Sequence, residues 1–144
     1  KFTFVRTTVL SRLIEGEFFN VEQMISSDYE TLVSVNRMDF LNNIDRAFTL
    51  SREGEKKPVV FDVKDGELEM SISTALGSMK SRLAVNKEGK DVYIGFNPRF
   101  FIEALKAIDD EVISIYFVNS NAPCFIRSKE GSYLYIILPI NINK

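Results

Sequence analysis

The residues best suited to chemistry are three consecutive carboxylates, Asp109, Asp110 and Glu111. Carboxylates can hold a hard metal ion or act as a general acid and base, so such a cluster could serve a hydrolase or a nucleotidyl transferase. However, the chain has no histidine, which removes the commonest general base and the commonest metal ligand. The sequence shows no second acidic cluster to converge on the first. We therefore expect an acidic loop, with no catalytic residue, no metal site and no cofactor.

Two further kinds of reactive site are disfavoured by the sequence. The seven glycines are scattered and fall mostly in turns, Lys-Asp-Gly at 64–66 and Lys-Glu-Gly at 87–89 and 129–131, so no glycine-rich phosphate loop is present. Cys124 is the single cysteine and lies in an apolar stretch, where a small buried side chain is the default expectation. One cysteine permits no disulfide within the chain and fits a reducing, cytoplasmic setting.

Composition limits the class of protein. A chain of 144 residues is about one ordinary domain and can bury a hydrophobic core. The net charge of −2 excludes a strongly basic nucleic-acid binder, so any contact with DNA must come from a local patch. No apolar run approaches the roughly 20 residues of a membrane helix, and no signal peptide is visible, so we expect no membrane partner.

Two segments are predicted to be helices. In the first, Asn36 is a suitable N-cap, and in the second Asn97 is followed by Pro98 at the first helical position, where its missing N–H costs nothing. Apolar residues then repeat at helical spacing in both segments. They are Phe40, Leu41, Ile44, Ala47 and Phe48 in the first, and Phe101, Ile102, Leu105 and Ile108 in the second.

Most of the remaining chain is predicted to form antiparallel strands separated by glycine-containing turns. The expected strands cover 58–63, 67–73, 81–85, 91–96, 111–118, 124–128 and 132–139. Segment 33–48 also aligns with 94–109, and the same order of strand, helix and strands follows each start. The sequence therefore predicts an α+β fold, an internally duplicated domain with its two helices side by side on one face of the antiparallel sheet.

Four segments, in the right order, resemble the bacterial sliding clamp, the β subunit of DNA polymerase III. They are "SRLIEGEFFNVEQMI" (11–25), "FTLSREG" (48–54), "IGFNPRFFIEALKAIDDEVISIYF" (94–117) and "SYLYIILPI" (132–140). By this resemblance the chain has the DNA-clamp fold and is a fragment. Residues 1–25 would be the last strands and connector of the second clamp domain, and 26–144 the third domain. Phe19, Val21 and Ser26 depart from the family pattern, as does the less basic ending "NINK".

The resemblance also implies a function. Clamp subunits form a ring around duplex DNA and raise the processivity of a polymerase without catalysing a reaction. The implied partners are duplex DNA, encircled without sequence reading, the DNA polymerase III catalytic subunit, the clamp loader, other proteins with a clamp-binding motif, and a second copy of the full-length chain in a homodimer. The alternative is a non-catalytic α+β adaptor that binds a protein partner and is unrelated to DNA.

The resemblance assigns residues to three surfaces. The pocket for partner peptides, between the second and third domains, would draw on Phe19, Gln23, Met24, Asn97, Phe100, Asn121, Pro123, Ile136, Ile137, Leu138, Pro139, Ile140, Asn141 and Ile142. Arg46 and Lys106 would face the DNA, although composition by itself favours ordinary solvated helix faces. Leu50 matches a position that the family uses at its subunit interface, or else caps the core locally.

Overall fold

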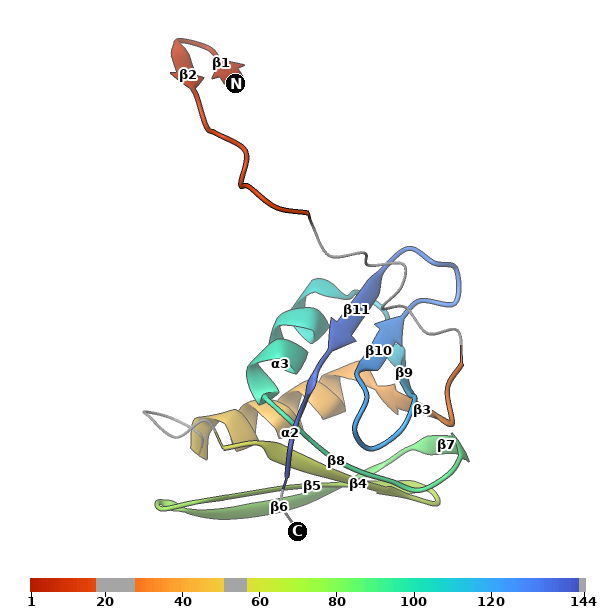
Figure 1. Cartoon of the computed structure of the whole chain (residues 1–144). Helices are drawn as coiled ribbons and strands as arrows, with labels where there is room; N and C mark the ends of the chain where they lie inside the picture. Colours follow the sequence, from red (N-terminus) through yellow and green to blue (C-terminus); the bar gives the residue numbers. More distant parts are fainter. Residues whose placement is uncertain (18–27, 51–56, 143–144) are drawn as a thin grey trace.

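Two helices lie at the centre of the fold, as Figure 1 shows for the computed structural model, which describes residues 1–17, 28–50 and 57–142. Helix α2 spans Arg37–Leu50 and helix α3 spans Pro98–Ala107. The side-chain oxygen of Asn36 accepts hydrogen bonds of 3.0 Å from the N–H groups of residues 38 and 39, and that of Asn97 accepts one of 3.0 Å from residue 99. Both predicted caps are therefore confirmed.

The strands of the main body form two five-stranded antiparallel sheets. The first sheet has the order β11-β10-β9-β3-β7, with β3 at Thr31–Asn36, β7 at Asn86–Gly89, β9 at Val112–Phe117, β10 at Cys124–Arg127 and β11 at Leu134–Ile137. The second has the order β12-β8-β4-β5-β6, with β4 at Val59–Lys64, β5 at Glu67–Thr74, β6 at Gly77–Ala84, β8 at Val92–Phe96 and β12 at Pro139–Ile140.

The strand order confirms the predicted α+β class and the internal duplication. Each half runs strand, helix and four strands, β3-α2-β4-β5-β6-β7 and then β8-α3-β9-β10-β11-β12. The halves exchange their first strands, because β3 pairs with β9 of the second half and β8 pairs with β4 of the first. This exchange divides the strands between two sheets, where the sequence analysis expected one, and each sheet contains both halves of the chain.

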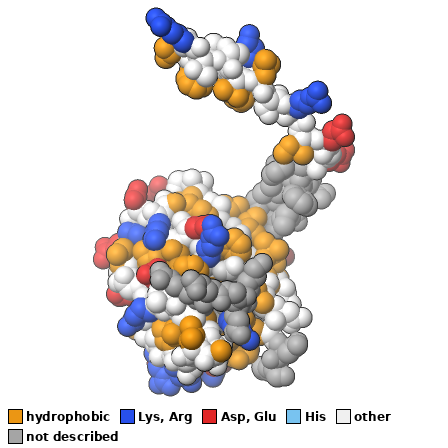
Figure 2. All heavy atoms as spheres, turned by 90° about the vertical axis from the view of Figure 1, so that its left-hand side faces the viewer, with side chains coloured by type: hydrophobic (Ala, Val, Ile, Leu, Met, Phe, Trp, Pro, Cys, Tyr) orange, Lys and Arg blue, Asp and Glu red, His pale blue; other side chains and the backbone are white. Residues whose placement is uncertain are grey.

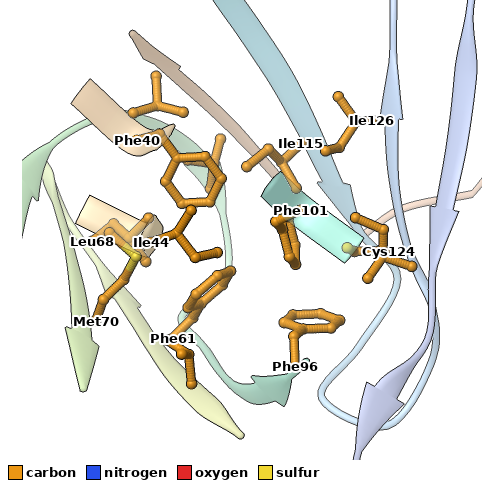
Figure 3. Packing of buried hydrophobic residues seen from close by; sticks show 14 of the residues in the cluster. Phe40, Ile44, Phe61, Leu68, Met70, Phe96, Phe101, Ile115, Cys124 and Ile126 are labelled. Atoms are coloured by element: carbon orange, nitrogen blue, oxygen red, sulfur yellow. The ribbon is translucent and has the colours of Figure 1, made fainter. Parts of the chain in front are cut away.

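A cluster of phenylalanine rings joins the helices to the second sheet (Figure 3). Phe101 of α3 lies 5.6 Å from Phe40 of α2, 5.2 Å from Phe61 of β4 and 5.1 Å from Phe96 of β8, measured between ring centroids. All four side chains are fully buried. Edge-to-face aromatic pairs at this distance stabilise beyond the burial of their area, so this cluster anchors the core.

The apolar run near the C-terminus crosses from one sheet to the other. β11 pairs with β10 in the first sheet, and two residues later β12 pairs with β8 in the second. Ile137 is 3% exposed at the end of β11, whereas Leu138 at the crossing is 59% exposed. The run therefore closes the core with one part and offers apolar surface with another.

Side-chain ties hold the two sheets together at one end. Lys87 of β7 has a side chain only 4% exposed. Its ammonium group lies 3.1 Å from Asp65, in the turn between β4 and β5, and 2.6 Å from Asp91, which directly precedes β8. In the acidic loop, the backbone oxygen of Asp110 accepts a hydrogen bond of 2.8 Å from Arg37. The Asp110 carboxylate accepts one of 2.5 Å from the hydroxyl of Tyr133. Asp110 therefore ties three segments of the fold together.

The raised pKa values of three side chains predict that the folded protein loses stability at alkaline pH. Burial raises the pKa of the Cys124 thiol, and burial with a carboxylate hydrogen bond raises the pKa of Tyr133. Hydrogen bonds to Asp91 and Asp65 raise the pKa of Lys87. A raised pKa means that the folded form keeps a proton that the unfolded chain loses, so the stabilisation is complete below the usual pKa and is lost as pH rises. The usual values are 9.0, 10.0 and 10.5 for Cys, Tyr and Lys.

We therefore expect the free energy of unfolding, measured in urea, to be level between about pH 7 and 8 and to fall from about pH 9 upward. Tyr133→Phe removes one of the three ionising groups, so its decline above pH 10.0 should be shallower than that of the parent chain. An unfolding free energy that stays level up to about pH 11 would contradict the assignment.

The first seventeen residues stand apart from this body. Strands β1 (Phe2–Phe4) and β2 (Thr7–Val9) form a hairpin, and every residue of 1–17 is exposed (Figures 1 and 2). Exposed apolar side chains include Leu13 and Ile14, at 96% and 95%. Within the described ranges, no helix is long and apolar enough to cross a membrane.

Candidate functional site

A groove of about 590 Å³ lies where the C-terminal strand joins the second sheet. It forms at the junction of β12 with β8, where Pro139 pairs with Phe96 and Ile140 pairs with Gly95. Its described lining residues are Tyr93, Ser120, Asn121, Pro139, Ile140, Asn141 and Ile142. A concave site with apolar walls and a few polar groups is the usual form of a binding site.

Five of the residues assigned to the peptide pocket from the sequence meet in this groove: Asn121 and the four consecutive residues Pro139 to Ile142. Sequence reasoning missed Tyr93 and Ser120. For Tyr93 a signal existed, because its strand neighbours Val92 and Ile94 are buried and strand alternation sends the residue between them to the opposite face.

The tail lies against β8 because residue 95 is glycine. A Cβ atom built on Gly95 would lie 2.6 Å from Cγ2 of Ile142 and 3.3 Å from the backbone oxygen of Ile140. A side chain at residue 95 would therefore force Ile142, and to a smaller extent the backbone of Ile140, to shift. On the other wall, the side chain of Asn119 accepts a hydrogen bond of 2.8 Å from the N–H of Asn121 and so shapes the loop that carries it.

The remaining predicted pocket residues do not line this groove. Phe100 and Leu138 are 50% and 59% exposed and are free to contact a partner. Asn97 uses its side chain as the cap of α3, and Ile137 is part of the core. Pro123 and Ile136 are half-buried. Phe19, Gln23 and Met24 lie outside the described residues.

The groove is electrically neutral, since none of its described lining residues is charged. Its hydrogen-bonding groups are the carboxamides of Asn121 and Asn141, the hydroxyl of Ser120 and the phenol of Tyr93. A carboxamide presents both donors and an acceptor, so the groove can match a neutral polar group. A charged group would be desolvated there without a counter-charge, which is costly.

The two predicted DNA-facing cations are exposed on the helices. Arg46 of α2 donates a hydrogen bond to the side-chain oxygen of Asn43, which restricts its orientation. Lys106 of α3 makes no ion pair with any residue in the described ranges.

Leu50, the residue assigned to the subunit interface, lies at the end of α2, where it is half-buried and packs against the core. Leu50 thus contributes to the core, and its contact with a second subunit stays a prediction.

In the part of the chain that the structure describes, no group of three cysteine, aspartate or glutamate side chains is arranged to hold a metal ion.

Comparisons with known proteins agree on one family. Residues 22–141 match the sequence family described as DNA polymerase III beta subunit, C-terminal domain. The chain is 32% identical over 134 residues to the beta sliding clamp of Staphylococcus aureus (strain Mu50 / ATCC 700699), an alignment that covers 91% of this chain and 36% of that protein. The chain thus spans about a third of the length of the curated relatives it matches.

Solved structures of the same kind share the fold. A protein described as a DNA polymerase III beta subunit from Eubacterium rectale superposes with a TM-score of 0.88 at 51% identity, over 93% of this chain and 36% of that one. A DNA polymerase sliding clamp from Bacillus subtilis gives 0.84 at 29% identity, over 92% and 36%. With the duplicated fold and the groove at its C-terminal strand, these matches show that the chain belongs to the DNA polymerase III beta subunit family, in its C-terminal domain.

Proposed function

We propose that this chain acts as part of a sliding clamp, a ring that encircles duplex DNA and tethers the replicative polymerase to it. The expected partners are the DNA polymerase III catalytic subunit, the clamp loader, other proteins that carry a clamp-binding motif, and a second copy of the full-length chain. The clamp would work in the cytoplasm, without a cofactor and without chemistry of its own. Family membership supports this role, and it disfavours the adaptor unrelated to DNA.

The observation that carries the proposal is the groove beside β12. Five residues assigned to the peptide pocket from the sequence, Asn121 and Pro139 to Ile142, come together in it from two separate segments. The half-exposed Phe100 and Leu138 supply further apolar area for a partner. Buried apolar anchors supply most of the affinity in such sites, and polar groups fix the orientation of the partner.

The exposed N-terminal segment supports the proposed division of the chain. We infer that residues 1–25 belong to the second clamp domain and residues 26–144 to the third. A two-stranded hairpin is marginally stable by itself, and the exposed apolar side chains of Leu13 and Ile14 need a partner surface. The rest of the second domain would supply that surface and the other half of the peptide pocket, so this chain alone should bind peptides weakly.

Contact with DNA would be weak and independent of sequence. Arg46 and Lys106 would reach phosphates from α2 and α3, which pack against each other. Two cations among exposed carboxylates such as Asp45 give few contacts, all weakened by salt. Weak contacts suit a ring that slides.

The test of this function is a nuclear magnetic resonance titration with an acetylated Gln-Leu-Ser-Leu-Phe peptide. We expect saturable shifts at the backbone amides of Asn121, Ile140, Asn141 and Ile142. Because the groove is neutral, replacing the peptide's glutamine by glutamate should weaken binding by about fivefold or more. A scrambled peptide of the same composition is the control.

Phe100→Ala should weaken binding of the glutamine peptide by about tenfold while leaving the fold intact. If the peptide causes no more shift than its scrambled control, the titration is repeated with a chain that includes the preceding domain. If the longer chain also shows no shifts beyond those of the scrambled control, the groove is not a peptide site and the proposal is overturned.

A further inference from the structure

A second groove, polar and about 310 Å³ in volume, lies on the outer face of the first sheet. Its described lining includes Ser34, Asp110, Ser114, Arg127, Lys129 and Glu130. None of the described residues lines both this groove and the groove beside β12. Nothing in the proposed clamp function uses it.

Three hydrogen-bonding side chains form a row across the floor of this groove. Ser34 of β3 lies directly opposite Ser114 of β9. Arg127 of β10 lies next to Ser114 on the other side, because the preceding residue, Ile126, is paired with Ile115. Side chains opposite each other on adjacent strands are about 5 Å apart, so the three can converge on one small group.

Ser114 is the buried member of this row. It is 8% exposed, and its neighbours Ile113 and Ile115 point into the core, so its hydroxyl points to the outer face. Among the described residues, neither its hydroxyl nor that of Ser34 has a hydrogen-bond partner. The other two serines of the groove are engaged, since Ser128 Oγ accepts bonds from the N–H and the hydroxyl of Ser132. The hydroxyls of Ser34 and Ser114 can therefore donate to, or accept from, a group bound in the groove.

Arg127 is fixed in place without being neutralised. Its guanidinium carbon lies 4.2 Å from the centroid of the Tyr116 ring, which in turn packs edge-on against Tyr29 at 4.9 Å. It forms no ion pair with any carboxylate in the described ranges. Stacking holds a guanidinium plane while leaving its N–H groups free to donate, which is the arrangement that binds an oxyanion in a fork.

The charge of the groove selects among oxyanions. Arg127 and Lys129 carry two positive charges, and Asp110 and Glu130 carry two negative ones, so the formal sum is zero. Asp110 already accepts the hydroxyl of Tyr133. A singly charged carboxylate leaves the site with one excess charge, whereas a phosphate near pH 7 brings close to two.

We propose that this groove binds the carboxylate of an acidic side chain in a partner peptide segment, held by Arg127 and the hydroxyls of Ser34 and Ser114. In a clamp, this groove would give a partner a second contact, on a face separate from the groove beside β12. The binding of a carboxylate here does not depend on the clamp function. Charge-assisted bonds at a partly exposed site are screened, so binding should weaken as salt rises.

The test is a titration of the full chain with N-acetylglutamate amide, followed by nuclear magnetic resonance, with N-acetylglutamine amide as the neutral control and inorganic phosphate as a competing oxyanion. We expect saturable shifts at Ser34, Ser114 and Arg127 with the glutamate compound alone. Arg127→Gln should weaken binding by about tenfold and Ser114→Ala by about threefold. As a control, Arg82→Gln removes a guanidinium of β6 that is paired with Glu69 of β5, and this change should leave the binding unaltered.

Equal shifts with the glutamine compound would overturn the proposal, as would tighter binding of phosphate than of the glutamate compound. If Arg127→Gln disturbs the packing of Tyr116, the affinity of the Ser114→Ala variant for the glutamate compound is the decisive measurement. Unchanged affinity in that variant would rule out the row of side chains as the binding site.

Discussion

Phe101→Ala is expected to lower the free energy of unfolding by about 3–5 kcal/mol, the largest effect of any single side-chain truncation considered for this chain. The ring is fully buried and contacts the rings of Phe40, Phe61 and Phe96, at centroid distances of 5.1 to 5.6 Å. Removing it takes apolar area out of the core and leaves a cavity between α2, α3 and the second sheet. The measurement is equilibrium unfolding in urea, from the transition midpoint and its slope.

Phe100→Ala is the matched control for this prediction. Phe100 is the preceding residue on the same helix, with the same side chain, but it is 50% exposed. Its truncation should cost about 0.5 kcal/mol of stability, as for most surface substitutions. A similar loss in the two variants would mean that α3 does not present Phe101 to the core and Phe100 to the surface.

Gly89→Ala is expected to lower the free energy of unfolding by roughly 2–5 kcal/mol, through two separate costs. The residue has φ of +101°, which side chains of L-residues rarely adopt. A Cβ atom there would also lie 2.0 Å from the backbone oxygen of Glu30 and 3.0 Å from Cα of Thr31. Both contacts are with backbone, so relief requires β3 and β7 to move apart at the end where they pair.

Gly66→Ala separates the two costs. Gly66 ends the related Lys-Asp-Gly turn with φ of +72°, but a Cβ there would meet nothing within 4 Å. Its replacement should cost only the conformational term, about 1 kcal/mol. Urea unfolding of both variants checks the difference, and equal losses would show that the backbone of Glu30 does not block residue 89.

The sequence predicted the local elements well, because short-range signals specify them. Asn36 and Asn97 act as caps in the structure, and the buried stripe of each helix contains the expected phenylalanines, Phe40 and Phe101. The hairpin turn at Asp65–Gly66 forms as expected, with Lys64 opposite Glu67. Caps, helical periodicity and turn glycines act within a few residues, so a single sequence reveals them.

The order of elements also predicted the duplicated α+β fold, but it did not reveal the exchange of β3 and β8 between the halves. Strand pairing joins residues far apart in the chain, such as Val33 with Ile115, and no local pattern encodes the partner. The two five-stranded sheets follow from that exchange. They also explain why Lys87 is nearly buried although its sequence surroundings are polar.

By itself, then, the sequence determined the helices, their caps, most strands and the apolar composition of the C-terminal run. Only the tertiary structure decided what each part of that run does. Ile137 completes the core in the first sheet, whereas Pro139 to Ile142 pass to the second sheet and meet Tyr93 and Asn121 in the groove. It likewise distinguished Gly66 from Gly89. Both end a Lys-acid-Gly triplet, but only Gly66 lies in the expected turn, whereas residues 87–89 belong to strand β7 and Gly89 pairs with Thr31. The physical reason is the same in both cases: the role of a residue depends on which distant backbone lies against it, and folding alone brings that backbone close.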